Sequence, residues 1–360
     1  MSTDTPSRRS TGETAPSVNK RRAPVMADVA RRAGVSLGTV SNVINNPGVV
    51  AERTLRKVQD AIDELGFVPN QVARSLAVGH ANTIGFVIVD LANSYFVDIA
   101  RGVEELADES GVRLLLANSD VDLAKQDSYL ELFEESRVSG ILLAPLDAPL
   151  TRAEQIRRRQ MPVVHVNWPG VDGESCGVVV DEELGGYTAT RHLIELGRQR
   201  LLFAGGPLSL SAVASRLTGA RRAVEEEQGR VTLELLETDR LTVAAGLAVG
   251  RGIANRPPDE RPDGLVSAAD ALASGAIQTM IYSGIEVPGD IAVIGYDNNH
   301  FAADHVIPIS TIGQPGVDMG RAAAKLLFEE ITRVPHVHRT ITMNPELIVR
   351  ESTTGRTWTD

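Results

Sequence analysis

The chain has 360 residues, of which 42% are hydrophobic and 23% are charged, and its formal net charge is −11. This length is too great for one hydrophobic core and predicts several domains. No apolar run is long enough for a membrane span or for the core of a signal peptide. The single cysteine, Cys176, excludes an intrachain disulfide, and we expect it to be a small buried apolar residue of a cytoplasmic protein.

The charge is unevenly distributed. Residues 1–80 hold 11 Lys and Arg against 7 Asp and Glu, a net charge of +4, so the remaining residues carry −15. A basic N-terminal region on an acidic protein favours a nucleic-acid-binding head on a body that avoids DNA. Residues 1–24 are rich in Ser, Thr, Pro and Arg without apolar periodicity, and we expect a disordered tail there.

Residues 26–45 have the pattern of a helix-turn-helix. Val29 and Ala33 lie on one face of a first helix, Gly34 suits a tight turn, and Ser36 stands at the N-cap of a second helix. The outer face of that second helix carries short polar side chains that suit the major groove. We expect the following residues to contact DNA: Ser36, Leu37, Gly38, Thr39, Ser41, Asn42 and Asn45.

A third helix is predicted from Glu52 to about Leu65, which completes a headpiece over residues 25–69. A hinge helix and linker follow over residues 70–81. Asn70 suits the cap of this short helix, and Gly79 ends it. So short a helix is unstable alone, and we expect it to form only when two copies pack together on DNA.

From residue 82 onward apolar strands alternate with helical stretches, which include residues 95–110, 123–136 and 185–196. Alternating units of this kind predict an α/β fold with doubly wound parallel sheets. Ligands of such sheets bind beyond the carboxyl ends of the strands. Polar residues stand at these ends: Asp90, Asn118, Asn167, Asp181, Asp270 and Asp297.

An ordered set of motifs carries a family resemblance: DVARRAGVS and TVSNVIN, then GFVPN at 66–70 and VARSL at 72–76, and on to PELIVRES from 345. The chain resembles the lactose-repressor/galactose-repressor family of bacterial transcriptional regulators. The resemblance implies a three-helix head and a body like periplasmic binding proteins, with two Rossmann-like subdomains. We place the first in residues 82–182 and 315–341, and the second in 183–314 and 342–356. The three crossovers lie near 181–183, 311–314 and 341–344.

The resemblance also implies how the chain functions. It predicts a repressor that binds a pseudo-palindromic operator as a homodimer, with Asn70, Ala73 and Leu76 of the hinge on the DNA and Leu76 inserted into the minor groove. A small-molecule effector binds between the lobes. The matching effector positions are Tyr95, Phe96, Asn167, Trp168, Asp181, Arg216, Asp297 and Gln314.

These effector positions suit a sugar. Phe96 and Trp168 offer faces for C–H bonds, and the polar groups bind hydroxyls. Each position also has a structural alternative, such as a helix cap for Asp181 or an ion pair for Arg216. Two departures from the family pattern make the pocket less polar: the loop PLSLSAVAS after Gly206, and an alanine at 269. A sugar derivative, purine or nucleoside therefore stays open as effector.

Other classes of protein are less well supported. The body alone would suit a solute-binding receptor, but the head and the missing export signal argue against that function. His336 and His338 form an i, i+2 pair on an expected strand, a spacing that is a weak indication of metal, and we expect surface or structural histidines. The Gly205-Gly206 turn lacks the phosphate-binding glycine patterns. We therefore expect neither an enzyme nor a cofactor. We also expect no tetramer, because no C-terminal leucine heptad is present.

Overall fold

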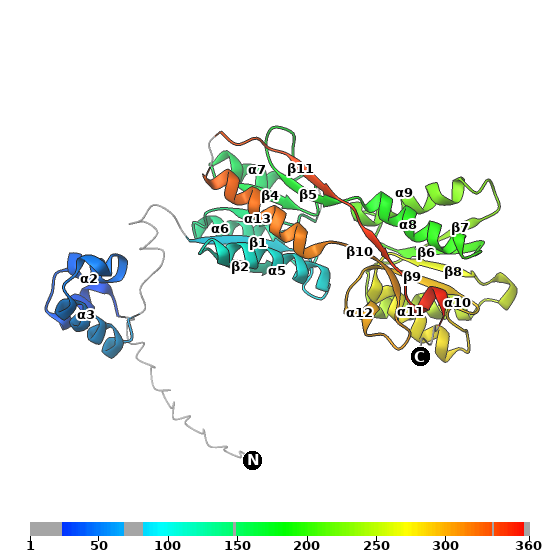
Figure 1. Cartoon of the computed structure of the whole chain (residues 1–360), viewed down its shortest axis with the longest axis horizontal. Helices are drawn as coiled ribbons and strands as arrows, with labels where there is room; N and C mark the ends of the chain where they lie inside the picture. The colour runs from blue at the N-terminus through cyan, green and yellow to red at the C-terminus, as the bar shows by residue number, and fades with distance from the viewer. Residues whose placement is uncertain (1–23, 68–81, 147–148, 333–334, 356–360) are drawn as a thin grey trace, which may run out of the picture. The chain divides into compact units, whose positions relative to one another are not determined.

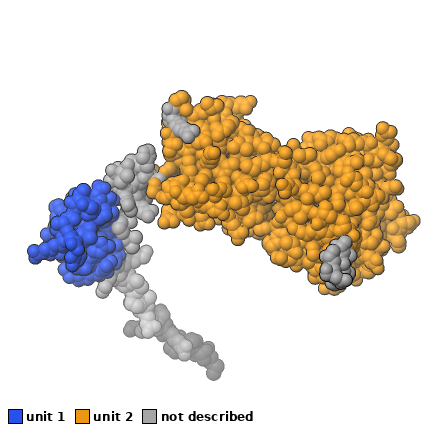
Figure 2. Space-filling model, in the orientation of Figure 1, with its two compact units in different colours: residues 1–79 blue, residues 80–360 orange. Residues whose placement is uncertain are grey.

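The computed structural model describes residues 24–67, 82–146, 149–332 and 335–355. It divides into two compact units, residues 1–79 and 80–360 (Figure 2). The predicted tail up to residue 23 and the whole predicted hinge and linker, 70–81, lie outside the described residues. The roles of Asn70, Ala73 and Leu76 therefore stay predictions.

The first unit contains the three predicted helices and one short 3-10 turn: α1 (Met26–Ala33), α2 (Leu37–Asn45), η1 (Pro47–Val49) and α3 (Glu52–Leu65). Gly34 closes α1 in the left-handed conformation, with φ of 66°, which a glycine adopts without strain. The core residues come from all three helices and the turn after α3: Val29, Ala30, Val40, Val43, Val58, Ala61 and Phe67.

The second unit has two lobes, each built on a six-stranded sheet (Figure 1). In the first lobe all strands are parallel, in the order β11-β5-β4-β3-β1-β2. Helices α5 and α13 pack on one face and helices α6 and α7 on the other. The bounds are β1 Thr83–Ile88, α5 Ser94–Glu109, β2 Arg113–Asn118, α6 Leu123–Glu135, β3 Ile141–Leu143, α7 Thr151–Arg158, β4 Val163–Val166, β5 Gly177–Val180, α13 Gly316–Thr332 and β11 Thr340–Met343.

The second lobe has the strand order β12-β10-β9-β8-β6-β7, in which only β12 is antiparallel. Helices α8 and α9 cover one face, and α10 and α11 cover the other. The bounds are α8 Glu182–Glu195, β6 Arg200–Gly205, α9 Ser211–Glu225, β7 Thr232–Glu237, α10 Val243–Ala254, η2 Pro258–Glu260, β8 Gly264–Ser267, α11 Asp270–Tyr282, β9 Ala292–Asp297, α12 His300–Ala303, β10 Ser310–Gly313, β12 Glu346–Ile348 and α14 Glu351–Thr354.

The chain crosses between the lobes three times: after β5, after β10 and after β11. Strand β11 stays in the first sheet up to Met343, so this sheet extends two residues past the expected boundary at 341. His336 and His338 precede β11 instead of lying on a strand, which corrects the expectation from their spacing. Within the described part of the chain, no helix combines the length and the apolar character that a membrane span needs.

Candidate functional site

The N-terminus of α2 is fixed by a side-chain cap. The Ser36 hydroxyl accepts the backbone N–H of Thr39 at 3.1 Å and lies 2.9 Å from the Thr39 hydroxyl. Val40 and Val43 are buried, which orients the helix so that Leu37 stays 53% exposed. Gly38 and Asn42 are exposed beside it. The first turn of α2 therefore presents one apolar side chain and short polar groups at the surface.

Some of the side chains predicted to contact DNA are half-buried or hydrogen-bonded within the head. Asn45 donates from Nδ2 to the Ser41 hydroxyl at 3.2 Å, and both residues are half-buried, as is Thr39. The described head, residues 24–67, also holds five basic and five acidic side chains. Its local charge is thus balanced, and the positive excess of the N-terminal region comes from residues outside it.

The body contains a cavity of about 490 Å³ between the two lobes. Its lining residues come from the segments that follow β1, β2, β3 and β4 in one lobe, and from those that follow β6 and β7 in the other, together with Asp297 at the end of β9. This arrangement agrees with the rule that ligands bind beyond the carboxyl ends of parallel strands. Six of the eight predicted effector residues line it: Tyr95, Phe96, Asn167, Trp168, Arg216 and Asp297.

Tyr95 and Phe96 lie in the first turn of α5, which begins where the Asn93 side chain accepts the Tyr95 N–H at 3.1 Å. Tyr95 is only 3% exposed, and its hydroxyl lies 3.0 Å from the Met319 sulfur and 3.5 Å from Asn167 Oδ1. Burial raises the pKa of Tyr95 well above its usual value. Tyr95 therefore lines the cavity and also stabilises its wall through the contacts of its hydroxyl group.

Arg216 is held by a buried ion pair. Its guanidinium donates two hydrogen bonds to the Glu182 carboxylate, at 2.8 and 3.1 Å, and a third to the Ala268 carbonyl at 2.7 Å. It also lies 3.7 Å from the centre of the Tyr296 ring. A side chain at Gly186 would overlap the Arg216 carbonyl, so this glycine lets α8 and α9 approach closely enough for the pair to form. The ion-pair alternative for Arg216 is thus present in the structure.

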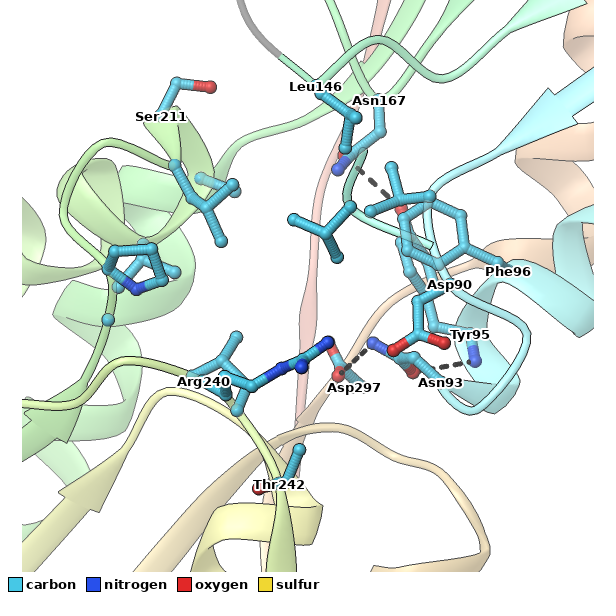
Figure 3. Close-up of a pocket in the computed structure, with 18 of the residues that line it drawn as sticks. Asp90, Asn93, Tyr95, Phe96, Leu146, Asn167, Ser211, Arg240, Thr242 and Asp297 are labelled. Carbon is cyan, nitrogen blue, oxygen red and sulfur yellow. Dashed lines mark hydrogen bonds between the residues drawn. The ribbon is translucent and has the colours of Figure 1, made fainter. Parts of the chain in front are cut away.

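Asp297 connects the lobes. It accepts a hydrogen bond from Gln314 Nε2 at 2.7 Å. It also accepts one from Asn93 Nδ2 at 3.2 Å, and Asn93 belongs to the first lobe whereas Asp297 belongs to the second (Figure 3). Burial raises the pKa of Asp297 to about 6, although Arg216, 3.8 Å away, acts in the opposite direction. The carboxyl group thus lies at the point where a change in lobe angle would break a hydrogen bond.

Two predicted effector residues are not among those that line the cavity. The Asp181 carboxylate caps α8 by accepting the Leu184 N–H at 2.8 Å, and Gln314 reaches the cavity only through Asp297. Asp270 is fully buried and accepts hydrogen bonds from the Thr311 hydroxyl and the Asn299 N–H. Burial raises the pKa of Asp270 well above its usual value. These groups support the walls of the cavity.

Sequence reasoning missed several polar lining residues: Asn93, Asp120, Ser211, Asp239, Arg240 and Thr242. Asp90, which was noted only for its place after a strand, also lines the cavity. Figure 3 shows Arg240 and Thr242 on the opposite side of the cavity from Asp90 and Phe96. Most of these residues stand in the loops just after β1, β2 and β7, and Ser211 is the first residue of α9, so the strand-end rule, applied to whole loops, would have found most of them.

Comparisons with known proteins agree with this architecture. Residues 25–70 match the family described as "Bacterial regulatory proteins, lacI family", and residues 190–353 match "Periplasmic binding protein-like domain". The chain is 35% identical over 327 residues to the HTH-type transcriptional repressor PurR of Photobacterium profundum, a match that covers 90% of this chain and 97% of the relative.

Two solved structures are similar over almost the whole chain. The transcriptional regulator CelR in complex with cellobiose is 29% identical, with a TM-score of 0.66, and 91% of this chain and 99% of that one are covered. The Lac repressor dimer bound to operator and the anti-inducer ONPF is 26% identical, with a TM-score of 0.75, and the covered shares are 92% and 99%.

These relatives are regulators with a DNA-binding head, so neither the enzyme hypothesis nor the receptor hypothesis is supported. The matches also span both the head and the body, in the order in which this chain carries them. The protein belongs to the LacI family of bacterial regulatory proteins and is an effector-controlled DNA-binding transcriptional regulator.

Proposed function

We propose that the protein is a cytoplasmic, dimeric repressor whose operator affinity is set by an uncharged sugar in the cavity between the lobes. The observation that carries this proposal is the composition of the lining. Among the described residues that line the cavity, Asp90, Asp120, Asp239 and Asp297 contribute four carboxylates against two guanidinium groups. One of these two, Arg216, is already paired with Glu182. Carboxylates accept hydrogen bonds from hydroxyls but repel phosphate.

The apolar part of the lining supports the same ligand class. Phe96 and Trp168 contribute aromatic surface to the first-lobe side, and Leu146 and Leu210 add aliphatic surface. Sugars combine C–H faces, which pack on such surface, with hydroxyls that need paired polar groups. A relative with 29% identity is described in complex with cellobiose, which supports a carbohydrate for this chain too.

A thermal-shift screen of the full-length protein tests the ligand class. Neutral mono- and disaccharides should raise the melting temperature, and phosphorylated sugars should not. Arg240→Ala removes an exposed lining cation, and we expect roughly tenfold weaker binding of the sugar that is found, as for a lost hydrogen bond to a charged group. Arg251→Ala, on an exposed face of α10 in the same lobe, is the matched control and should leave affinity unchanged.

A purine or nucleoside is the second candidate, because the aromatic surface of Phe96 and Trp168 would also stack on a heterocycle. The same screen includes purine bases and nucleosides. Stabilisation by a purine base, with no response to any sugar, would replace the sugar by this alternative and leave the assignment as a regulator intact.

The dimer is proposed from symmetry and from exposed apolar surface. A pseudo-palindromic operator requires two heads related by a twofold axis. In the body, β2 is an edge strand of the first sheet and exposes Leu115 by 42% and Leu116 by 43%, which suits burial against a second copy. Light scattering should show a dimer, and replacement of both leucines by Ser should shift it toward monomer.

A further inference from the structure

A cluster of four potential metal ligands lies at the edge of the first lobe, and none of the four lines the effector cavity. Cys176 directly precedes β5, Glu330 lies in the last turns of α13, and His336 and His338 precede β11. Parallel pairing places Thr340 of β11 opposite Gly177 of β5, so the residues before both strands meet. Strands β5 and β11 lie side by side (Figure 1), so sheet topology brings together residues that are 160 positions apart in the sequence.

The distances within the cluster suit a single ion. Cys176 Sγ lies 3.2 Å from His336 Nε2 and 3.8 Å from His338 Nδ1, and the latter lies 4.0 Å from Glu330 Oε2. All four ligand atoms lie within 4.8 Å of one another. Metal–ligand bonds of about 2.0–2.3 Å at tetrahedral angles require ligand atoms about 3.5 Å apart. A contraction of at most about 1.3 Å in any one separation would therefore complete the coordination shell.

The surroundings of the cluster also resemble those of a metal site. Cys176 is fully buried, and its sulfur accepts the backbone N–H of Arg339 at 3.4 Å, a contact that stabilises a thiolate. Glu330 Oε2 is buried and has no hydrogen-bond partner among the described residues. Burial raises the pKa of Glu330 to about 7. A buried carboxylate oxygen that accepts no hydrogen bond is costly, and a cation would offset that cost.

The donor set identifies the kind of metal. One thiolate, one carboxylate and two neutral imidazoles carry two negative charges, which a divalent ion balances. Sulfur and nitrogen donors fit Zn²⁺, whereas Mg²⁺ and Ca²⁺ prefer all-oxygen shells. The basic side chains whose charges act on the cluster already have acidic partners, since Arg157 pairs with Glu174 at 3.1 Å and Arg339 with Glu329 at 2.8 Å.

We propose that Cys176, Glu330, His336 and His338 form a zinc site that fastens the end of α13 to the β5–β11 edge of the first sheet. This proposal replaces the expectations that Cys176 is only a small buried apolar residue and that the two histidines are surface or structural groups. A closed shell of four protein ligands is typical of a structural zinc site. The site holds the segment that continues through β11 into the last crossover between the lobes.

Cobalt titration of the tag-free, chelator-treated full-length protein, under a non-thiol reductant, tests the proposal. We expect one Co²⁺ per chain, with the sulfur-to-cobalt charge-transfer band and the intense visible bands of tetrahedral coordination, and displacement by Zn²⁺. Cys176→Ser should abolish the charge-transfer band, and His336→Ala/His338→Ala should weaken binding by at least about tenfold. His300→Ala, an exposed histidine of the second lobe, is the control and should behave as wild type.

Thermal unfolding separates loss of the site from loss of the fold. Zinc should raise the melting temperature of the wild type and of His300→Ala but not that of Cys176→Ser, while the metal-free proteins melt alike. The proposal is overturned if the wild type binds no stoichiometric Co²⁺, if the charge-transfer band persists in Cys176→Ser, or if zinc shifts all variants equally.

Discussion

The recognition helix and the effector cavity are built in opposite ways. Helix α2, Leu37–Asn45, presents side chains that are close together in the sequence, and its two buried valines, Val40 and Val43, fix its orientation. The cavity gathers side chains from seven strand ends in two lobes. The residues of the recognition helix are thus neighbours in the sequence, whereas those of the cavity are brought together by the fold. We therefore expect substitutions on the exposed face of α2 to affect folding less than substitutions in the cavity wall.

The polar groups of the two sites differ accordingly. On α2, Asn42 is exposed and its removal leaves no buried partner behind. In the cavity wall, Arg216, Glu182 and Asp297 are buried and depend on one another. Removal of Arg216 leaves two carboxylates without a counter-charge in a medium of low polarity, which costs more than the ion pair itself contributes.

The largest expected effect is the loss of stability on removal of the buried Arg216–Glu182 ion pair. Arg216→Ala should destabilise the body by about 3–5 kcal/mol, because Glu182 and Asp297 lose their counter-charge. Arg222→Ala is the matched control, since Arg222 pairs with Glu183 between the same two helices but both side chains are exposed, and about 0–1 kcal/mol is expected. Urea unfolding followed by tryptophan fluorescence reports on the body, because Trp168 lies there. Equal losses in the two variants would contradict the assigned role of burial.

The second effect is a pH dependence at Asp297. In the folded protein the pKa of Asp297 is about 6, above the usual value for an aspartate. Between about pH 4 and 6 the folded protein therefore binds more protons at this carboxyl group than the unfolded chain does. The contribution of Asp297 to the free energy of unfolding consequently falls as pH rises through that range. A difference of about two in pKa corresponds to about 3 kcal/mol.

Asp297→Asn should therefore be more stable than wild type at pH 8, by up to about 3 kcal/mol, with a smaller advantage at pH 5. Gln314 Oε1 is buried and lacks a hydrogen-bond partner among the described residues, so a flipped Gln314 amide would accept from the amide that the substitution introduces. Asp239→Asn, an exposed carboxylate of the same lobe, is the control. Urea unfolding at both pH values measures the difference. If Asp297→Asn is more stable than wild type by the same amount at pH 5 as at pH 8, the predicted titration of Asp297 in this pH range is wrong.

The third effect concerns base preference. Leu37→Gln replaces an exposed apolar side chain by one that donates and accepts, and should change the preferred base at one position of each half-site, a discrimination of about 1–3 kcal/mol. Non-specific affinity and folding should be unaffected. Gln59→Leu, on the exposed face of α3, is the control for altered polarity. A randomised-operator selection that returns the same consensus for wild type and Leu37→Gln would remove Leu37 from the DNA-contacting surface.

The smallest effect is expected from the N-terminal segment. Deletion of residues 2–23 removes five cations, Arg8, Arg9, Lys20, Arg21 and Arg22, whereas the described head is charge-balanced. Non-specific affinity should fall, and the slope of log affinity against log salt should become shallower by up to about 4. Replacement of the five cations by Gln should reproduce the deletion, and an unchanged slope in both variants would show that these charges stay away from DNA.

Much of the fold follows from local patterns. The third helix was expected at 52–65 and occupies Glu52–Leu65, and the helix expected at 95–110 is α5, Ser94–Glu109. The helix expected from 185 begins at Glu182, because Asp181 acts as its N-cap, one of the two roles that the sequence leaves open for that carboxylate. Caps and ligands use the same short polar residues, so the sequence alone did not separate the two roles.

The sites depend more strongly on contacts between distant residues. No local sequence pattern marks Glu182 as a partner of Arg216, and only the packing of α8 on α9 brings the two side chains together. The spacing of the two histidines is a weak indication of metal and Cys176 gives none, because a local pattern does not reveal the pairing of β5 with β11. Periodicity predicts which face is buried, but not which buried groups meet.

The most direct test of the central claim links the two sites in one experiment. Operator affinity is measured by fluorescence anisotropy, on a DNA site obtained by selection, with and without the sugar that raises the melting temperature. We predict a change of at least about fivefold in wild type and in Arg251→Ala. Arg240→Ala should bind the operator normally without sugar but need a higher sugar concentration for the same change. Operator affinity that is identical at saturating sugar and without sugar would contradict control of DNA binding through the cavity.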